Sequence, residues 1–306
     1  MRIGFYAPWA NGDMAESTGV LKYVDVLFPG SDLFWFTRPK AKSVADPDMV
    51  KFHPRLNIRM STEPPAVLWS CREGHRQNSE GHALSVPSEM AGRLTQVKNQ
   101  YESLRDLDLC YFAAPWANCD LLQSVHFVLI NTKVYPYLPG MMAHPDLRFS
   151  EEEDAAAEKY IRLMTHTDGY NIMMETRYGS GQSFWNDGTT QTVMSACRRI
   201  FGDKCNFIFA SVGSKPNVAD TYGCDEFTIR QCLPIYNRCS LFLGVSSSIT
   251  VSTCSWSANP LVPRIDCVTN PWTSTNPIAR GKSVTCLSEQ ALYTMLDNVL
   301  LGVRRK

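Results

Sequence analysis

A carboxylate that follows the first apolar run of the chain is a candidate for acid–base chemistry, both by its residue type and by its position. Residues 3–7 form that run, and Asp13 comes shortly after it in the sequence Asn-Gly-Asp. At the carboxyl end of a strand, a carboxylate can take the proton of a hydroxyl group within hydrogen-bond reach. The same side chain could instead cap the following helix, which would stabilise that helix by about 0.5 to 2 kcal/mol. The residues alone leave both roles of Asp13 open.

Two turns rich in glycine and serine could bind a phosphate group. Each follows an apolar run and precedes an expected helix, so amides at the helix start and serine hydroxyls could receive the negative charge. The first turn lacks the Lys-Ser/Thr ending of a P-loop, and plain helix capping explains the second equally well. The candidate residues are Arg177, Gly179, Ser180, Gly181, Gln182 and Ser183 in the first turn and Gly244, Ser246, Ser247 and Ser248 in the second.

Acidic residues flank the strand expected at 170–176. Glu175 lies at its exit, where it could bind a sugar or ribose hydroxyl, whereas Asp168 is expected to be a solvated loop residue. None of the six histidines has the spacing of a metal site, and the 11 cysteines include no Cys-x-x-Cys pair. We therefore predict no metal site, and we expect the cysteines to be reduced and buried.

The elements that would position these residues alternate between strand and helix. Apolar runs predict the strands, and apolar residues at helical spacing predict the helices between them. This alternation is typical of a parallel sheet with helices on both faces. The expected strands are 3–7, 33–37, 56–60, 66–70, 107–115, 126–131, 170–176, 206–212, 240–246 and 260–270, and the expected helices are 19–28, 150–165, 192–202, 227–239, 248–258 and 287–306.

The sequence predicts an α/β protein of two Rossmann-like, doubly wound lobes with a cleft between them. Each lobe opens with a strand and a glycine-containing turn, and ligands in such folds sit beyond the carboxyl ends of the strands. The expected parts are an N-terminal lobe at 1–150, a linker helix region at 151–169 and a C-terminal lobe at 170–306. The polar stretch 71–90 is expected to be a long loop.

Charge and hydropathy disfavour two classes of partner or location. The 306 residues include 30 Lys plus Arg and 30 Asp plus Glu, so the chain is no polycation for nucleic acid. No run approaches the roughly 18 apolar residues of a membrane helix, and the first residues do not read as a signal peptide. We expect a cytoplasmic protein.

The opening of the chain resembles the N-terminal signature of the bacterial lipopolysaccharide heptosyltransferases. In that family a first strand leads to a Gly-Asp pair, a helix, a Pro-Gly pair and an aromatic second strand, and Gly12, Asp13, Pro29 and Gly30 match this order. The later stretch CSLFLGVSSSITVSTCSW, residues 239–256, resembles the strand, loop and helix that hold the family's donor. The donor loop reads Asp-Ser-Gly in the family and Ser246–Ser248 here, which indicates a distant relative with another nucleotide sugar.

The resemblance implies a GT-B glycosyltransferase that inverts configuration without a metal or other cofactor. The first lobe would bind a glycan or glycolipid acceptor through Asn11 and Gly12, with Asp13 as the catalytic base. The two serine and glycine turns would hold the nucleotide-sugar donor in the second lobe. Such an enzyme would serve the synthesis of surface polysaccharide or a lipopolysaccharide-like glycan, and a lipid acceptor would bring it to the inner face of the membrane as a peripheral protein.

Two other functions fit the same pattern of elements. A nucleotide-sugar epimerase would need further acid–base groups and would form its product without an added acceptor. A sugar-nucleotide-binding module without activity would bind ligand, show no turnover and be indifferent to Asp13→Ala. The sequence leaves both alternatives open beside the transferase.

Overall fold

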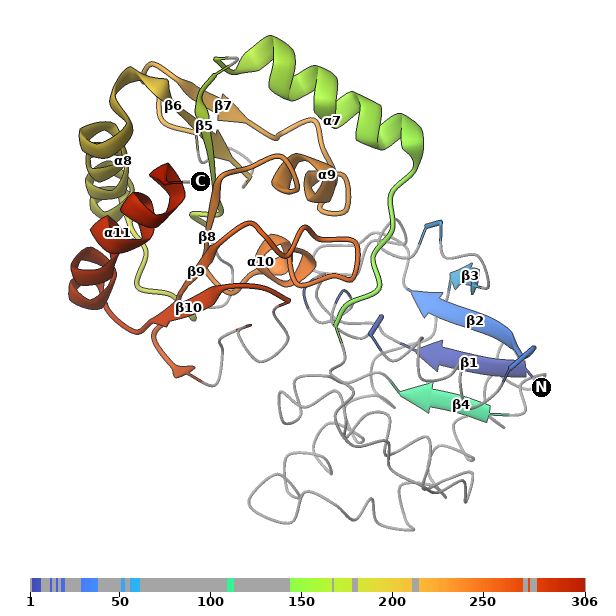
Figure 1. The fold of residues 1–306 in the computed structure, drawn as a ribbon. Coiled ribbons are helices and arrows are strands. Elements are labelled where there is room, and N and C mark those ends of the chain that lie inside the picture. Colours follow the sequence, from blue (N-terminus) through green and yellow to red (C-terminus); the bar gives the residue numbers. More distant parts are fainter. Residues whose placement is uncertain are drawn as a thin grey trace. The chain divides into compact units, whose positions relative to one another are not determined.

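The chain forms two compact units, Met1–Asp146 and Leu147–Lys306. They are seen in a computed structural model (Figure 1). The expected cleft between two lobes stays a prediction. The structure describes residues 2–6, 12, 15, 18–19, 29–37, 51–52, 56–60, 109–112, 144–166, 168–177, 181–210, 215–271, 275 and 280–305.

The first unit contains a parallel sheet of four described strands. Their order is β3-β2-β1-β4, so the first strand of the chain lies inside the sheet. This confirms four of the expected strands, while those at 66–70 and 126–131 and the loop at 71–90 lie outside the described residues. The strands are β1 (Arg2–Tyr6), β2 (Asp32–Thr37), β3 (Leu56–Met60) and β4 (Leu109–Phe112).

The second unit contains a six-stranded parallel sheet in the order β10-β9-β8-β5-β6-β7. From β5 the chain builds outward to β7, then returns to the other side of β5 and builds outward to β10. This is the doubly wound order, and its direction reverses between β5 and β8. The strands are β5 (Tyr170–Met174), β6 (Cys205–Phe209), β7 (Thr221–Gly223), β8 (Leu241–Gly244), β9 (Arg264–Cys267) and β10 (Ser283–Cys286).

Local signals fix the ends of the long helices. Ser150 and Glu153 form a capping box at the start of α7 (Glu151–Met164). The Asn186 side chain caps α8 (Asp187–Phe201), which ends at Gly202 with φ 66°, followed by the short 3-10 helix η3 (Gly202–Lys204). Ser288 caps α11 (Glu289–Arg304) in the same way. These caps explain why the expected helices at 150–165 and 192–202 and at the C-terminus are confirmed.

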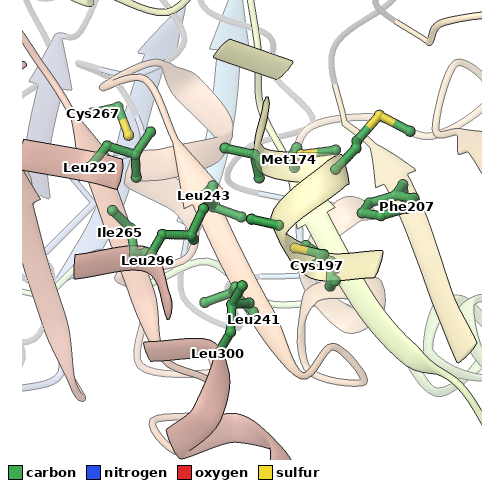
Figure 2. Packing of buried hydrophobic residues seen from close by; sticks show 14 of the residues in the cluster. Met174, Cys197, Phe207, Leu241, Leu243, Ile265, Cys267, Leu292, Leu296 and Leu300 are labelled. Carbon is green, nitrogen blue, oxygen red and sulfur yellow. The ribbon is translucent and has the colours of Figure 1, made fainter. Parts of the chain in front are cut away.

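The core of the second unit lies between the sheet and the helix pair α8 and α11, which pack side by side on one face (Figure 1). Leu292, Leu296 and Leu300 of α11 recur every four residues, and in Figure 2 they lie beside the strand residues Cys267, Ile265 and Leu241. The short helices α9 (Cys232–Tyr236) and α10 (Ser248–Ser252) lie on the other face. Burial of the eight described free cysteines, such as Cys197 and Cys267, agrees with the expectation for thiols.

The helix expected at 227–239 is much shorter in the structure. Only Cys232–Tyr236 is helical, and the preceding residues form turns in which Thr228 and Gln231 exchange hydrogen bonds. Pro234 explains the difference. Proline has no amide to donate and clashes with the preceding turn inside a helix, but it is tolerated in the first turn, where Pro234 lies.

Helix α7 lies within the second unit, Leu147–Lys306. Buried Arg230, beside α9, pairs with Glu153 and also donates to the Arg148 carbonyl oxygen over 3.0 Å. Arg238, just after α9, binds both carboxylate oxygens of Asp154 at 2.6 and 2.9 Å. These pairs tie the acidic first turn of α7 to α9. In the part of the chain that the structure describes, no helix is long and apolar enough to cross a membrane.

Candidate functional site

The carboxyl ends of β5 and β8 lie side by side where the sheet order reverses. The Glu175 amide donates to the Leu243 carbonyl oxygen over 2.9 Å, so the ladder continues one residue beyond β5. From this edge the chain continues from β5 into the predicted turn at 177–183 and from β8 into the predicted turn at 244–248. In doubly wound folds such an edge is the usual place of a ligand.

Glu175 is 3% exposed and holds the start of α10. One carboxylate oxygen accepts from the Thr250 amide at 2.7 Å and from its hydroxyl at 2.5 Å, and the other accepts from the Ile249 amide at 3.2 Å. Burial raises the pKa of this carboxyl, and the hydrogen bonds from Thr250, Ile249 and Ser247 oppose that rise. The side chain is therefore a clamp between β5 and α10, and its direct contact with a sugar stays a prediction.

This clamp corrects one expectation about the second turn. The amides at the start of α10 were expected to face a phosphate, but those of Ile249 and Thr250 already donate to the Glu175 carboxylate. A phosphate at the same place would displace or repel that carboxylate. The Ser247 hydroxyl also bonds to Glu175, so what the turn offers a ligand is the hydroxyls of Ser246 and Ser248 and the remaining backbone.

The turn that joins β8 to α10 is shaped by close packing. A Cβ on Gly244 would lie 2.7 Å from a ring carbon of Phe242 and closer still to the Thr250 hydroxyl, so only glycine fits there. Ser246 has φ 55°, a left-handed conformation that is uncommon outside glycine. Ser247 is the N-cap residue of α10, and Ser246, Ser247 and Ser248 are all half-buried.

The described part of the first turn lies at the carboxyl end of β9. The Gln182 carbonyl oxygen accepts from the Thr269 amide at 2.9 Å, and the Ser183 hydroxyl donates to the Cys267 carbonyl oxygen at 2.5 Å. Gly181 has φ 68° and open space where a Cβ would be, and Arg177 is exposed. Because β9 neighbours β8, both predicted turns reach the same edge of the second unit's sheet.

Beneath the second turn lies a buried polar network that the sequence analysis missed. Arg264, 2% exposed, donates to the Thr250 carbonyl oxygen at 3.2 Å and to Asp266 at 3.2 Å. Asp266 in turn accepts from the amide and hydroxyl of Thr275 at 2.9 and 2.5 Å. The signal was present, because an Arg and an Asp two residues apart share one face of a strand that is otherwise apolar. This network holds the Thr250 carbonyl oxygen, while Glu175 holds the Thr250 amide and hydroxyl.

Several predicted site residues lie outside the described residues. These are Asn11, Asp13, Gly179 and Ser180, so their roles stay predictions. Gly12, which follows β1 in the first unit, is helical and half-buried. Among the described residues no group of three or more His, Cys, Asp or Glu side chains could hold a metal ion.

Comparison with known proteins gives a likeness of fold. No protein-family model matches the chain, and no curated protein matches its sequence. A glycosyltransferase family 9 protein from Veillonella parvula has a TM-score of 0.63 at 12% identity, over 98% of this chain and 97% of that one. The ADP-heptose lipopolysaccharide heptosyltransferase II of E. coli has a TM-score of 0.61 at 13% identity, over 99% of this chain and 100% of that one. The E. coli heptosyltransferase WaaC with ADP has a TM-score of 0.54 at 10% identity, over 98% of this chain and 100% of that one.

These solved structures are glycosyltransferases, and the fold of this chain is similar to theirs over nearly its whole length. The resemblance inferred from the sequence, to the lipopolysaccharide heptosyltransferases, is thereby confirmed at the level of the fold. The part of this fold that the structure describes most fully is the six-stranded parallel sheet of the second unit.

Proposed function

We propose that this protein is a glycosyltransferase that moves a sugar from a nucleotide-sugar donor to a hydroxyl group of a glycan or glycolipid acceptor. The observation that carries the proposal is the place of turn 244–248, at the reversal of a doubly wound parallel sheet. Nucleotides bind such sheets at this place. The likeness to glycosyltransferases along 98% or more of the chain supports the same reaction class. The glycan would be a surface polysaccharide or resemble lipopolysaccharide, and the enzyme would work in the cytoplasm.

The second unit would bind the donor. Since Glu175 occupies two amides of α10 and the Ser247 hydroxyl, the hydroxyls of Ser246 and Ser248 are the groups of this turn that would face the diphosphate. The backbone at Gly181 can approach a phosphate closely because nothing lies where its side chain would be. Exposed Arg177 would add positive charge. Hydroxyls, amides and a guanidinium can stabilise a departing diphosphate without a metal.

The first unit would bind the acceptor and supply the base. Asp13 would take the proton of the acceptor hydroxyl as its oxygen forms a bond to the anomeric carbon. The bond from that carbon to the diphosphate breaks, and the nucleoside diphosphate leaves with the electron pair. Attack from the face opposite the leaving group inverts the configuration.

The experiment is a transfer assay with the purified protein, nucleotide sugars and glycan acceptors, with product mass and released nucleoside diphosphate as readouts. We expect release that depends on the acceptor, and its loss in Asp13→Asn with donor binding retained. The matched control is Asp32→Asn, because Asp32 is exposed at the amino end of β2 in the same unit. Equal activity of Asp13→Asn and the control would remove Asp13 from the mechanism.

The acceptor dependence separates the proposal from its rivals. A new nucleotide sugar formed without acceptor would identify an epimerase. Donor binding without turnover, over the whole range of acceptors, would identify a binding module.

A further inference from the structure

The stretch 255–288 of the sequence contributes no exposed negative charge. Asp266 is the only Asp or Glu in this stretch, and it is fully buried against Arg264. Arg280 and Lys282 remain as the other charged residues, and Lys282 is exposed. This stretch is therefore positively charged in a protein whose total formal charge is zero.

Apolar side chains of this stretch are exposed close to Arg280. Leu261 is 74% exposed and Trp256 is 37% exposed, and Pro260 beside Leu261 is exposed as well. The Arg280 guanidinium lies 4.9 Å from the Trp256 ring centroid and donates to the Trp256 carbonyl oxygen. A Cβ on Gly281 would overlap the Pro260 carbonyl oxygen, so the two chain segments are in contact. We call Trp256, Pro260, Leu261, Arg280 and Lys282 the tryptophan–leucine patch.

The loop that presents the patch is held in place by its surroundings. The Asn237 side chain donates to the Ser257 carbonyl oxygen at 3.0 Å and accepts from the Asn259 amide at 2.7 Å. The Leu261 amide donates to the Asn259 side chain at 3.0 Å. Since these bonds fix the backbone, Leu261 is exposed by a defined conformation. Docking through such a loop costs less conformational entropy than docking through a mobile one.

The patch lies at the opposite edge of the sheet from the proposed donor site. Residues 256–262 lead into the amino end of β9, and residues 280–282 lead into the amino end of β10. Turn 244–248 and residues 182–183 lie at the carboxyl ends of these parallel strands. Within the second unit, a surface that covers the patch would leave the donor turn uncovered.

We propose that the tryptophan–leucine patch docks on a membrane surface that contains anionic lipids. Tryptophan is favoured at the boundary between headgroups and acyl chains, and an exposed leucine gains free energy when it enters that boundary. Arg280 and Lys282 complement the negative surface potential, and residues 255–288 themselves add no exposed carboxylate that would oppose it. A protein partner of unknown charge has no such argument in its favour. The proposal does not depend on sugar transfer, although it would bring a glycolipid acceptor within reach.

The test is sedimentation of the full chain with vesicles, either of phosphatidylcholine alone or of phosphatidylcholine mixed with phosphatidylglycerol. We expect binding that requires phosphatidylglycerol. Lys282→Gln should weaken it about five-fold, the value of one basic residue near an anionic surface. Leu261→Ser should weaken it by about ten-fold or more. The matched control is Leu163→Ser, because Leu163 is 64% exposed in the last turn of α7, outside the tryptophan–leucine patch.

Several results would overturn the proposal. They are failure of the wild type to sediment with anionic vesicles, equal binding to both kinds of vesicle, or an effect of Leu163→Ser as large as that of Leu261→Ser. A concentration-dependent dimer that Leu261→Ser abolishes, with no vesicle binding, would assign the patch to a second copy of the chain instead. Because the assay contains no donor, its outcome is independent of the transfer assay.

Discussion

Replacement of Glu175 by glutamine should destabilise the protein by an amount that follows from its hydrogen bonds. The carboxylate accepts from two donors of Thr250 at 2.7 and 2.5 Å and from the Ile249 amide at 3.2 Å. A glutamine has one acceptor oxygen. With that oxygen toward Thr250, its NH2 group faces the Ile249 amide, and one buried donor is left without an acceptor. A buried donor without an acceptor lowers the free energy of unfolding by about 1 to 3 kcal/mol.

The assay is urea unfolding of wild type and Glu175→Gln at neutral pH, with the free energy of unfolding taken from the linear extrapolation. Ser248→Ala is the matched control, because no hydrogen bond of the Ser248 hydroxyl falls among the described residues, and its effect should stay within about 0.5 kcal/mol. A loss below that limit for Glu175→Gln would refute the clamp. So would a control that loses as much stability as Glu175→Gln.

Three further substitutions test other parts of the second unit by the same unfolding assay. Gly244→Ala should lower the free energy of unfolding by about 1 to 3 kcal/mol, because the added methyl group would overlap Thr250 and Phe242. Gly302→Ala in α11 places its methyl group in open space and should raise the free energy of unfolding by about 0.5 to 1 kcal/mol. The opposite order of the two variants would contradict the packing. Glu153→Ala should cost about 3 to 5 kcal/mol, because it leaves Arg230 buried without its partner. Burial tends to raise the pKa of Glu153, but its hydrogen bonds to Arg230 and Ser150 lower it overall. The contribution of this carboxylate should therefore be complete above about pH 4.3, its unfolded value, and should disappear as the pH falls through the lower folded pKa. A difference between wild type and Glu153→Ala that grows on acidification would refute the pairing.

Much of the second unit could be predicted because its signals are local. The capping box at Ser150 and the glycine at 202 mark helix ends in the sequence itself, and apolar runs mark β5, β6 and β8. Strands β7 and β10 were missed because they are short and lie at the edges of the sheet, where pairing with a neighbour rather than composition makes them strands.

The organisation of the candidate site was less predictable because it depends on distant contacts. Glu175 was expected beside a ligand. Its hydrogen-bond partner Thr250 follows 75 residues later, and no local sequence pattern predicts that pair. Gly244 was expected in a phosphate-binding turn, which stays a prediction, and the structure adds that Thr250 and Phe242 fill the space where a side chain would be. The sequence thus located the edge of the sheet at which these residues meet, and the structure shows which of them build the turn.

Thermal unfolding in the presence of nucleoside diphosphates and nucleotide sugars tests the central claim most directly. A ligand present at a hundred times its Kd stabilises by about 2.7 kcal/mol, which corresponds to a rise in Tm of about 5 to 10 °C for a unit of this size. We expect one nucleotide to raise the Tm selectively, and Gly244→Ala to reduce that rise at equal ligand concentration. If no nucleotide raises the Tm even at millimolar concentration, turn 244–248 is not a donor site and the proposed function is wrong.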